Sequence, residues 1–195
     1  WLMEQMIEQA KEVGCKVHNE HIINIDFTKR PFKFTSSSDL VFLANSVIIS
    51  TGASAKWLGL ESEKKYTGFG VSACATCDAF FFKNKIVAVV GGGNTAVEEA
   101  LFLTKFATKV ILIHRRNSLR AEKVLQKRLF KNKKIEVLWD STVTEIIGTK
   151  EPKKVSSIKL KNIKDNSFKQ IEIDGIFIAI GHKPNTNIFF NKLDL

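Results

Sequence analysis

Cys74 and Cys77 are separated by two residues and followed directly by Asp78. Cysteines at this spacing form a redox disulfide, supply half of a zinc site, or pack in a core as small apolar side chains. Zinc usually takes four closely spaced ligands, and nothing places Cys15 or the nearby histidines beside this pair, so we expect no metal. We therefore favour a redox pair, in which Asp78 donates and accepts protons as thiolates form and collapse. A capping or solvated Asp78 is the alternative.

A glycine-rich segment, Gly91-x-Gly93-x-x-Ala96, follows the cysteines. In a dinucleotide-binding turn the first glycine permits a tight turn, the second lets the backbone approach a pyrophosphate, and the third small residue lets helix and strand pack closely. The phosphates then face the N–H groups of a helix N-terminus. An apolar run precedes this segment and a helical pattern follows it, which favours a dinucleotide site over a plain structural turn.

The residues after the next predicted strand indicate which dinucleotide binds. NAD sites usually carry an acid there, which holds the ribose 2′-hydroxyl. This chain has His114, Arg115 and Arg116, with Arg120 shortly after. Arginines form charge-assisted hydrogen bonds with a 2′-phosphate, so we predict NADPH rather than NADH, with a solvated basic face as the alternative. Together with the cysteine pair, this predicts electron transfer from NADPH toward a disulfide.

Composition limits the remaining function classes. The chain has 195 residues, of which 44% are hydrophobic, and a formal net charge of +10. A packed globular chain is expected, and no apolar run is long enough to span a membrane. Residues 105–134 contain eleven Lys or Arg and only one acid, Glu122. We do not favour nucleic acid as the partner, because this basic run lacks the interleaved aromatic residues of single-strand binders. A single Cys pair beside βαβ units indicates a cytoplasmic protein.

The first part of the chain is predicted to contain one helix and an antiparallel meander. Apolar residues recur at helical spacing over Leu2–Val13. Strand-like segments follow at Lys16–Ile25, Phe32–Thr35 and Leu43–Ser50, joined by polar turns. The polar, glycine-containing segment Glu61–Gly70 is expected to be a linker.

The second part alternates strands and helices, as a doubly wound α/β domain does. The predicted strands are Ile86–Val90, Val110–His114, Ile135–Trp139 and Gly175–Ile180, the helices are Asn94–Phe106 and Ala121–Phe130, and the segments Val143–Ile147, Val155–Lys161 and Phe168–Ile173 form a small β insertion. This alternation predicts a Rossmann-like domain with a parallel sheet.

Several motifs, in order along the chain, resemble bacterial-type, low-molecular-weight thioredoxin reductase. They are Ser50–Ala55, Gly70–Asp78, Gly91–Ala100, His114–Ala121 and Ala179–Thr186. The resemblance spans essentially the whole chain and implies an α/β fold, with a Rossmann-like NADPH-binding domain joined to an incomplete FAD-binding domain. It implies three parts: residues 1–58 in the FAD domain, residues 59–183 as the NADPH domain with the Cys pair, and residues 184–195 returning into the FAD domain. The chain, which begins at Trp1, is expected to be a fragment of a longer protein.

The resemblance also implies an activity, because the family reduces the disulfide of thioredoxin with NADPH through bound FAD. Cys77 would face the flavin, Cys74 would attack thioredoxin, and Asp78 would donate protons. The implied cofactor residues are Gly91, Gly93, Asn94, Thr95 and Ala96 for the NADPH phosphates, Arg115, Arg116 and Arg120 with His114 for the 2′-phosphate, and Thr51 and Gly52 near FAD. Part of the aromatic cluster Phe80–Phe82 would contact thioredoxin, with core packing as the alternative.

Two departures from the family pattern qualify these expectations. The family usually has glycine after the Cys-Asp pair, where this chain has Ala79. If that position needs a positive φ, alanine costs about 1 kcal/mol. The family's N-terminal glycine fingerprint and C-terminal Gly-Asp segment are absent, so this chain should bind FAD poorly and not turn over alone. The family is homodimeric mainly through its FAD domain, so a monomeric fragment is compatible with the resemblance.

Two other functions are alternatives. One is an NADPH-binding module without catalysis. The other is the flavoprotein subunit of alkyl hydroperoxide reductase, which also combines a Cys pair with this fold. That protein resembles the chain less, because it lacks the basic run from His114 to Arg120 and uses NADH.

Overall fold

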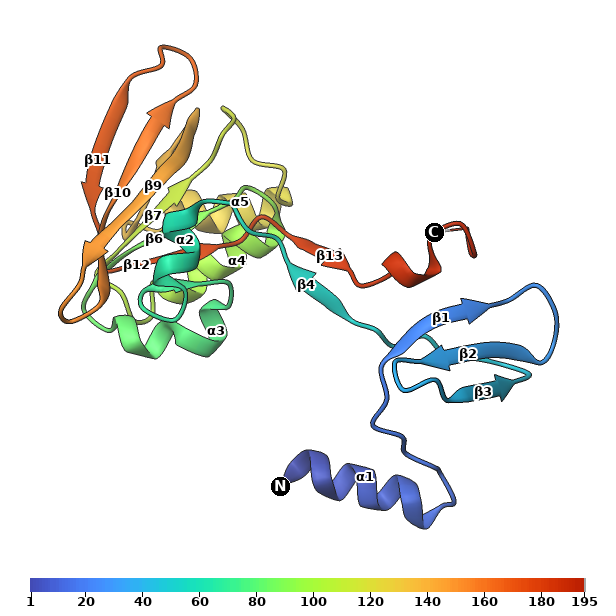
Figure 1. Ribbon diagram of the computed structural model, residues 1–195. Helices are drawn as coiled ribbons and strands as arrows, with labels where there is room; N and C mark the ends of the chain where they lie inside the picture. The colour runs from blue at the N-terminus through green and yellow to red at the C-terminus, as the bar shows by residue number, and fades with distance from the viewer. Residues whose placement is uncertain (195) are drawn as a thin grey trace. The chain divides into compact units, whose positions relative to one another are not determined.

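The computed structural model describes residues 1–194, which form two compact units (Figure 1). The N-terminal unit consists of Trp1–Gly52 together with the segment that begins at Pro184. The central unit is Ala53–Lys183. Among the described residues, no helix is long and apolar enough to cross a membrane.

The N-terminal unit contains one helix and an antiparallel sheet. Helix α1 (Leu2–Glu12) ends just before Gly14, whose φ of +86° lies in the left-handed region that glycine adopts freely. The strands β1 (Ile22–Asp26), β2 (Phe32–Ser36) and β3 (Val41–Ala44) pair in that order. The predicted meander is therefore confirmed. A short 3₁₀ helix, η2 (Asn187–Phe189), follows in the C-terminal segment.

The predicted strand Leu43–Ser50 is wrong over most of its length. Strand β3 ends at Ala44, and the apolar residues Val47–Ile49 pair with no strand in the described part of the chain. Ile48 is 92% exposed. An apolar run predicts burial, but a strand also requires a hydrogen-bonded neighbour, which this run lacks here.

The central unit is built on a five-stranded, all-parallel sheet, which confirms the predicted Rossmann-like α/β domain with a parallel sheet. Its order is β5-β12-β6-β7-β8. The strands are β5 (Val71–Ser72), β12 (Gly175–Ile178), β6 (Ile86–Val90), β7 (Lys109–Ile113) and β8 (Ile135–Leu138). The last four residues of β6 and of β7 are buried, because helices cover one face of the sheet and a second sheet covers the other.

On one face of the sheet lie α4 (Asn94–Leu103) and α5 (Lys123–Lys131). Leu103 of α4 is fully buried against Leu112 and other residues of this face. On the opposite face lies the predicted β insertion, an antiparallel sheet of β9 (Ser141–Thr149), β10 (Lys154–Asn162) and β11 (Phe168–Glu172). Ile158 of β10 is fully buried against that face.

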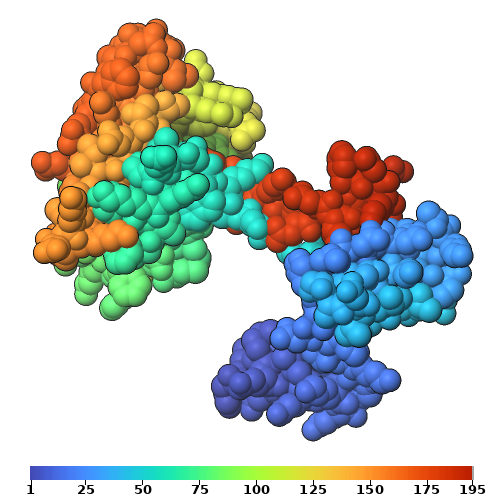
Figure 2. Space-filling view, in the orientation of Figure 1, coloured from blue at the N-terminus to red at the C-terminus, as the bar shows by residue number. Residues whose placement is uncertain are grey.

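The segment Glu61–Gly70 is not a linker, which corrects the sequence-based expectation. It contains helix α2 (Glu61–Tyr66), which packs on β9; Figure 2 shows this teal segment against the orange strands. Glu63 is only 1% exposed, and its carboxylate accepts hydrogen bonds from the backbone N–H groups of Leu58 (2.9 Å) and Gly59 (3.0 Å). The polar composition therefore reflects internal hydrogen bonding rather than exposure to solvent.

The chain passes between the two units at two short strands. These are β4 (Ala53–Ala55) and β13 (His182–Pro184), which pair with each other. Beside them, Gly52 accepts a hydrogen bond at its carbonyl from the backbone N–H of Asn185, at 3.0 Å.

Candidate functional site

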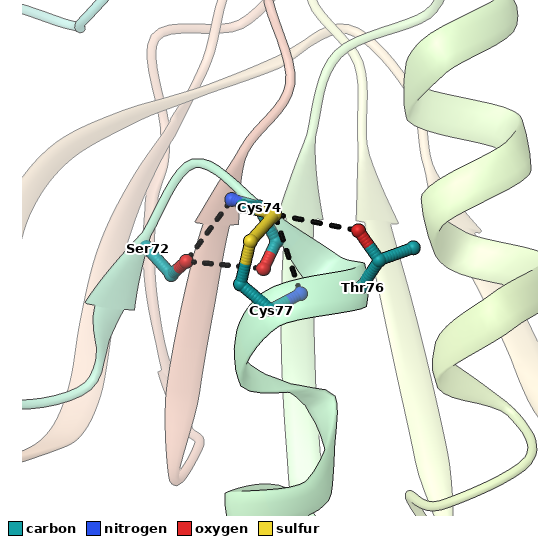
Figure 3. The surroundings of a disulfide bond; sticks show 4 residues. All are labelled: Ser72, Cys74, Thr76 and Cys77. Carbon is teal, nitrogen blue, oxygen red and sulfur yellow. Dashed lines mark hydrogen bonds between the residues drawn. A yellow bond between two sulfur atoms is a disulfide. The ribbon is translucent and has the colours of Figure 1, made fainter. Parts of the chain in front are cut away.

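Cys74 and Cys77 form a disulfide, which confirms the predicted pair (Figure 3). Cys74 is the N-cap of the short helix α3 (Ala75–Asp78), which directly follows β5. The backbone N–H of Cys77 donates to Cys74 Sγ at 3.2 Å, and the backbone N–H of Cys74 donates to Ser72 Oγ at 3.0 Å. Cys77 is exposed and Cys74 is half-buried. The disulfide is therefore fixed by local backbone contacts and remains accessible.

Ser72 is a contributor that the sequence reasoning missed. Its hydroxyl also contacts the carbonyl oxygen of Cys74 at 3.4 Å, so it holds the backbone that leads into the disulfide. A serine two residues before a turn is a recognisable local signal, because its oxygen accepts from the N–H two positions later.

The residue after the Cys-Asp pair is not strained. Ala79 has φ −55° and ψ −32°, in the right-handed helical region, and is buried. The cost expected for a positive φ therefore does not arise. Asp78 is half-buried and lines a hollow of about 400 Å³ together with Phe81 and Lys85. The predicted proton donor, which directly follows Cys77 in the sequence, therefore borders an open hollow.

The aromatic cluster after the disulfide divides into two kinds of environment. Phe82 is buried and its ring packs edge-on against Phe177, with ring centroids 5.3 Å apart. Phe80 and Phe81 are 70% and 68% exposed. Core packing therefore explains one ring, and the other two rings remain exposed on the surface.

The predicted dinucleotide turn joins β6 to α4. A Cβ atom on Gly91 would lie 2.6 Å from Ala96 Cβ and would overlap the carbonyl oxygen of Ala179, and its φ of +155° also disfavours a side chain. A Cβ atom on Gly93 would meet no protein atom within 4 Å. Gly91 is therefore needed for packing, whereas the space beside Gly93 is open to a ligand. Ala96 is fully buried where helix and strand meet, as the fingerprint requires.

His114 lies beneath this turn rather than on its surface. It is 6% exposed, and its ring occupies the place of any side chain on Gly92. Its Nε2 is hydrogen-bonded with the carbonyl oxygen of Ser118 at 3.0 Å. Burial lowers the pKa of His114, which the backbone hydrogen bonds of Ser118 and Gly91 partly oppose. The imidazole therefore supports the turn in its neutral form.

The buried imidazole leads to a pH prediction. Because the pKa of His114 in the folded chain is lowered from its usual 6.5, the unfolded chain takes up this proton first as the pH falls. The contribution of the neutral His114 imidazole to the free energy of unfolding is fully present above pH 6.5 and is lost progressively below it. We expect His114→Gln to show a smaller loss of stability between pH 7.5 and pH 5.5 than the unmodified chain, as measured by urea unfolding. The exposed His182→Gln is the matched control, and equal losses in all three proteins would contradict the prediction.

The three predicted arginines follow β7 in a loop that is tied to the glycine turn. Arg115, Arg116 and Arg120 are exposed and form no ion pair with any residue that the structure describes. The backbone N–H of Arg120 donates to the carbonyl oxygen of Gly92 at 2.7 Å, and the next N–H donates to the same oxygen at 3.2 Å. This brings unneutralised positive charge to the edge of the turn.

Asn94 connects the two helices rather than presenting a free amide. Its Nδ2 donates to the carboxylate of Glu122 at 3.3 Å, and its Oδ1 accepts from the backbone N–H of the same residue at 2.9 Å. Glu122 is the single acid in the basic run, so this pairing keeps it at the N-cap of α5. Thr95, beside it, is exposed in the first turn of α4.

The disulfide, the glycine turn and the arginine loop share one edge of the sheet. They follow the carboxyl ends of β5, β6 and β7, which are parallel strands. In open α/β sheets this edge is where ligands bind. Thr51 and Gly52 lie in the N-terminal unit, where the carbonyl of Thr51 accepts from the side-chain amide of Asn185 at 3.0 Å.

Comparisons with known proteins agree with this arrangement. The family model for pyridine nucleotide-disulphide oxidoreductases matches residues 4–195. The chain is 54% identical to a thioredoxin reductase of Rickettsia conorii over 99% of its own length and 62% of that protein. It is 47% identical to one of Coxiella burnetii, over 100% of its own length and 61% of that protein.

Solved structures give the same result. The thioredoxin reductase of Lactococcus lactis superposes with a TM-score of 0.82 at 37% identity, over 97% of this chain and 62% of that one. The thioredoxin reductase of Giardia duodenalis superposes with a TM-score of 0.80 at 40% identity, over 96% and 60%. The chain thus spans about three fifths of the length of the relatives it matches. The resemblance to thioredoxin reductases is confirmed, and the chain belongs to the pyridine nucleotide-disulphide oxidoreductase family.

Proposed function

We propose that this chain is the central part of an NADPH-dependent thioredoxin reductase. The observation that carries the proposal is the common sheet edge that holds the Cys74–Cys77 disulfide, the open Gly93 turn and arginines that form no ion pair with a described residue. The whole protein would be a cytoplasmic homodimer that reduces thioredoxin. Residues 59–183 form its NADPH domain, and residues 1–58 and 184–195 belong to its FAD domain.

The residues of the central unit fit a bound NADPH. The pyrophosphate would lie against Gly93 and the first turn of α4, where N–H groups lack intrahelical partners. Arg115, Arg116 and Arg120 would hold the 2′-phosphate by charge-assisted hydrogen bonds. The glycine turn would be supported by the buried residues Gly91, Ala96 and His114. Its exposed side would be lined by Asn94 and Thr95. FAD, when bound in the whole protein near Thr51 and Gly52, supplies the step that carries electrons from the nicotinamide to the disulfide.

The disulfide residues would then pass the electrons on. Reduction breaks the Cys74–Cys77 bond and leaves two thiols, one of which attacks the thioredoxin disulfide as a thiolate. Asp78 would hold or release the proton of that thiol at the hollow that it lines. The exposed Phe80 and Phe81 would contact the thioredoxin surface.

Calorimetric titration of this chain with NADPH and then NADH tests the proposal. We expect saturable NADPH binding, with NADH at least about tenfold weaker, because only NADPH offers a phosphate to the arginines. Equal affinities for NADPH and NADH would favour the alternative function, that of the NADH-dependent flavoprotein subunit of alkyl hydroperoxide reductase. Absence of binding in a chain whose circular dichroism shows the expected helix and strand content would overturn the dinucleotide site itself.

The two cysteines are expected to differ in their reaction with thioredoxin. With Cys15 replaced by serine, Cys77→Ser leaves Cys74 as the only thiol, and Cys74→Ser leaves Cys77. A bacterial thioredoxin carrying a thionitrobenzoate mixed disulfide releases the coloured thiolate when a protein thiolate attacks it. We expect release by the Cys77→Ser chain to be about tenfold faster, although Cys74 is the less exposed sulfur. The reverse order would assign the attack on thioredoxin to Cys77.

A further inference from the structure

Gln126 is a half-buried polar side chain on α5 that has no part in the proposed function described above. Its Nε2 atom donates two hydrogen bonds, to the carbonyl oxygen of Ala121 at 2.6 Å and to that of Leu119 at 3.3 Å. An amide nitrogen carries two hydrogen atoms, so both bonds can form at once. Ala121 and Leu119 are the two neighbours of Arg120 in the sequence. The Gln126 amide therefore bridges the backbone on either side of this arginine.

Further contacts hold the backbone of Arg120 in place. Its N–H donates to the carbonyl oxygen of Gly92 at 2.7 Å, which attaches it to the glycine turn. Leu119 and Ala121 are only 8% and 5% exposed, and both belong to the core between the sheet and its helices. The side chain of Arg120 is exposed. The loop thus fixes the backbone from which an exposed guanidinium group extends.

A fixed backbone favours phosphate binding, because an arginine loses conformational freedom when it holds a ligand. Ordering a loop and a long side chain on binding costs free energy, and a loop that is already ordered reduces that cost. The two hydrogen bonds from Gln126 restrict the loop before any ligand arrives. Without them, the carbonyl groups of Leu119 and Ala121 lose a donor and turn toward other partners.

We propose that Gln126 is a positioning residue for the 2′-phosphate of NADPH, which acts through Arg120 and thereby favours NADPH over NADH. The inference rests on the proposed binding of NADPH at the glycine turn. NADH has no phosphate on this ribose, so it gains nothing from an ordered Arg120. A purely structural role of Gln126 would instead affect the two nucleotides alike.

Titration calorimetry of Gln126→Met with NADPH and NADH tests this role. Methionine has a similar length and helix propensity, carries no donor and leaves the net charge unchanged. We expect NADPH affinity to fall about fivefold and NADH affinity to stay within about twofold of the unmodified chain. The matched control is Gln170→Met on β11 of the β insertion, which removes a hydrogen bond of 3.0 Å from Gln170 Nε2 to Ser157 Oγ. This control should bind both nucleotides as the unmodified chain does.

A double-mutant cycle shows whether Gln126 acts through Arg120. In a chain that already carries Arg120→Ala, Gln126→Met should change NADPH affinity by less than about twofold, because no guanidinium group remains to be positioned. The full fivefold loss in that background would overturn the inference. Equal losses for NADPH and NADH in Gln126→Met alone would overturn it as well.

Two further comparisons separate this role from folding and from the proposed function. Circular dichroism shows whether each variant is folded, and Gln126→Ala makes the same comparison if Gln126→Met does not fold. An unmodified chain that binds neither nucleotide would overturn the proposed function together with the inference. An unmodified chain that prefers NADPH, with the same preference in Gln126→Met, would remove only the role of Gln126.

Discussion

Replacing Arg115 and Arg120 together by alanine is expected to weaken NADPH binding by about a hundredfold and to leave NADH binding nearly unchanged. Each charge-assisted hydrogen bond contributes about 1.5–3 kcal/mol, and about 1.4 kcal/mol corresponds to a tenfold change in affinity. Both arginines are exposed and unpaired within the described part of the chain, and the backbone of Arg120 is fixed on the glycine turn. Titration calorimetry with both nucleotides measures the difference.

The control must separate a specific phosphate site from a diffuse basic surface. Lys127 and Arg128 are exposed residues of the same basic run, on α5, and their double alanine variant removes the same formal charge. We expect this variant to bind NADPH within about threefold of the unmodified chain at physiological salt, because screening weakens charges that do not touch the ligand. Similar losses in the two double variants, or equal losses for NADPH and NADH, would contradict a 2′-phosphate site at Arg115 and Arg120.

Substituting alanine for Gly91 is expected to destabilise the chain by about 3 kcal/mol, because the added methyl group has no space. It would overlap the backbone carbonyl of Ala179 and lie 2.6 Å from Ala96 Cβ, and neither atom can rotate away. The φ of +155° adds backbone strain to the clash. Urea unfolding measured by circular dichroism gives the change in stability. A stability close to that of the unmodified chain would mean that β6 and α4 pack less closely than described.

Gly93→Ala is the matched variant, with the opposite expected result. A methyl group there meets no protein atom within 4 Å, and the φ of −92° suits any residue. We expect its stability to change by no more than about 1 kcal/mol, the typical effect of a changed N-cap residue. NADPH affinity should nevertheless fall at least about tenfold, because the methyl group fills the space that the pyrophosphate backbone contact needs. Unchanged NADPH affinity would place the phosphates elsewhere.

The sequence by itself predicted most of the central unit. Strand β6 has the predicted bounds Ile86–Val90, because a continuous apolar run between polar segments suits a strand that is covered on both faces. The glycine spacing placed the turn correctly, since the tight turn and the close packing of Ala96 depend on local backbone chemistry. Helix α4 is shorter than predicted and ends at Leu103, because apolar periodicity marks a face and does not mark where hydrogen bonding stops.

The sequence-based predictions were least accurate for polar residues that the fold buries. The segment containing Glu63 looks like a linker, since charged residues are usually exposed. Its burial depends on two backbone N–H groups that the preceding turn brings to the carboxylate. His114 likewise belonged to a basic run that predicted ligand contact, and the structure places its ring beneath Gly92.

The sequence alone determined which residues carry the chemistry. These are the pair Cys74 and Cys77, the glycines of the turn and the arginines that follow β7. Only the tertiary structure decided that Phe82 is buried while Phe80 and Phe81 are exposed, and that α3 packs against α4. The physical reason is that local patterns encode hydrogen bonding and periodicity within one element. Contacts between α3 and α4 depend instead on how parallel strands order themselves in the sheet, and no local pattern carries that information.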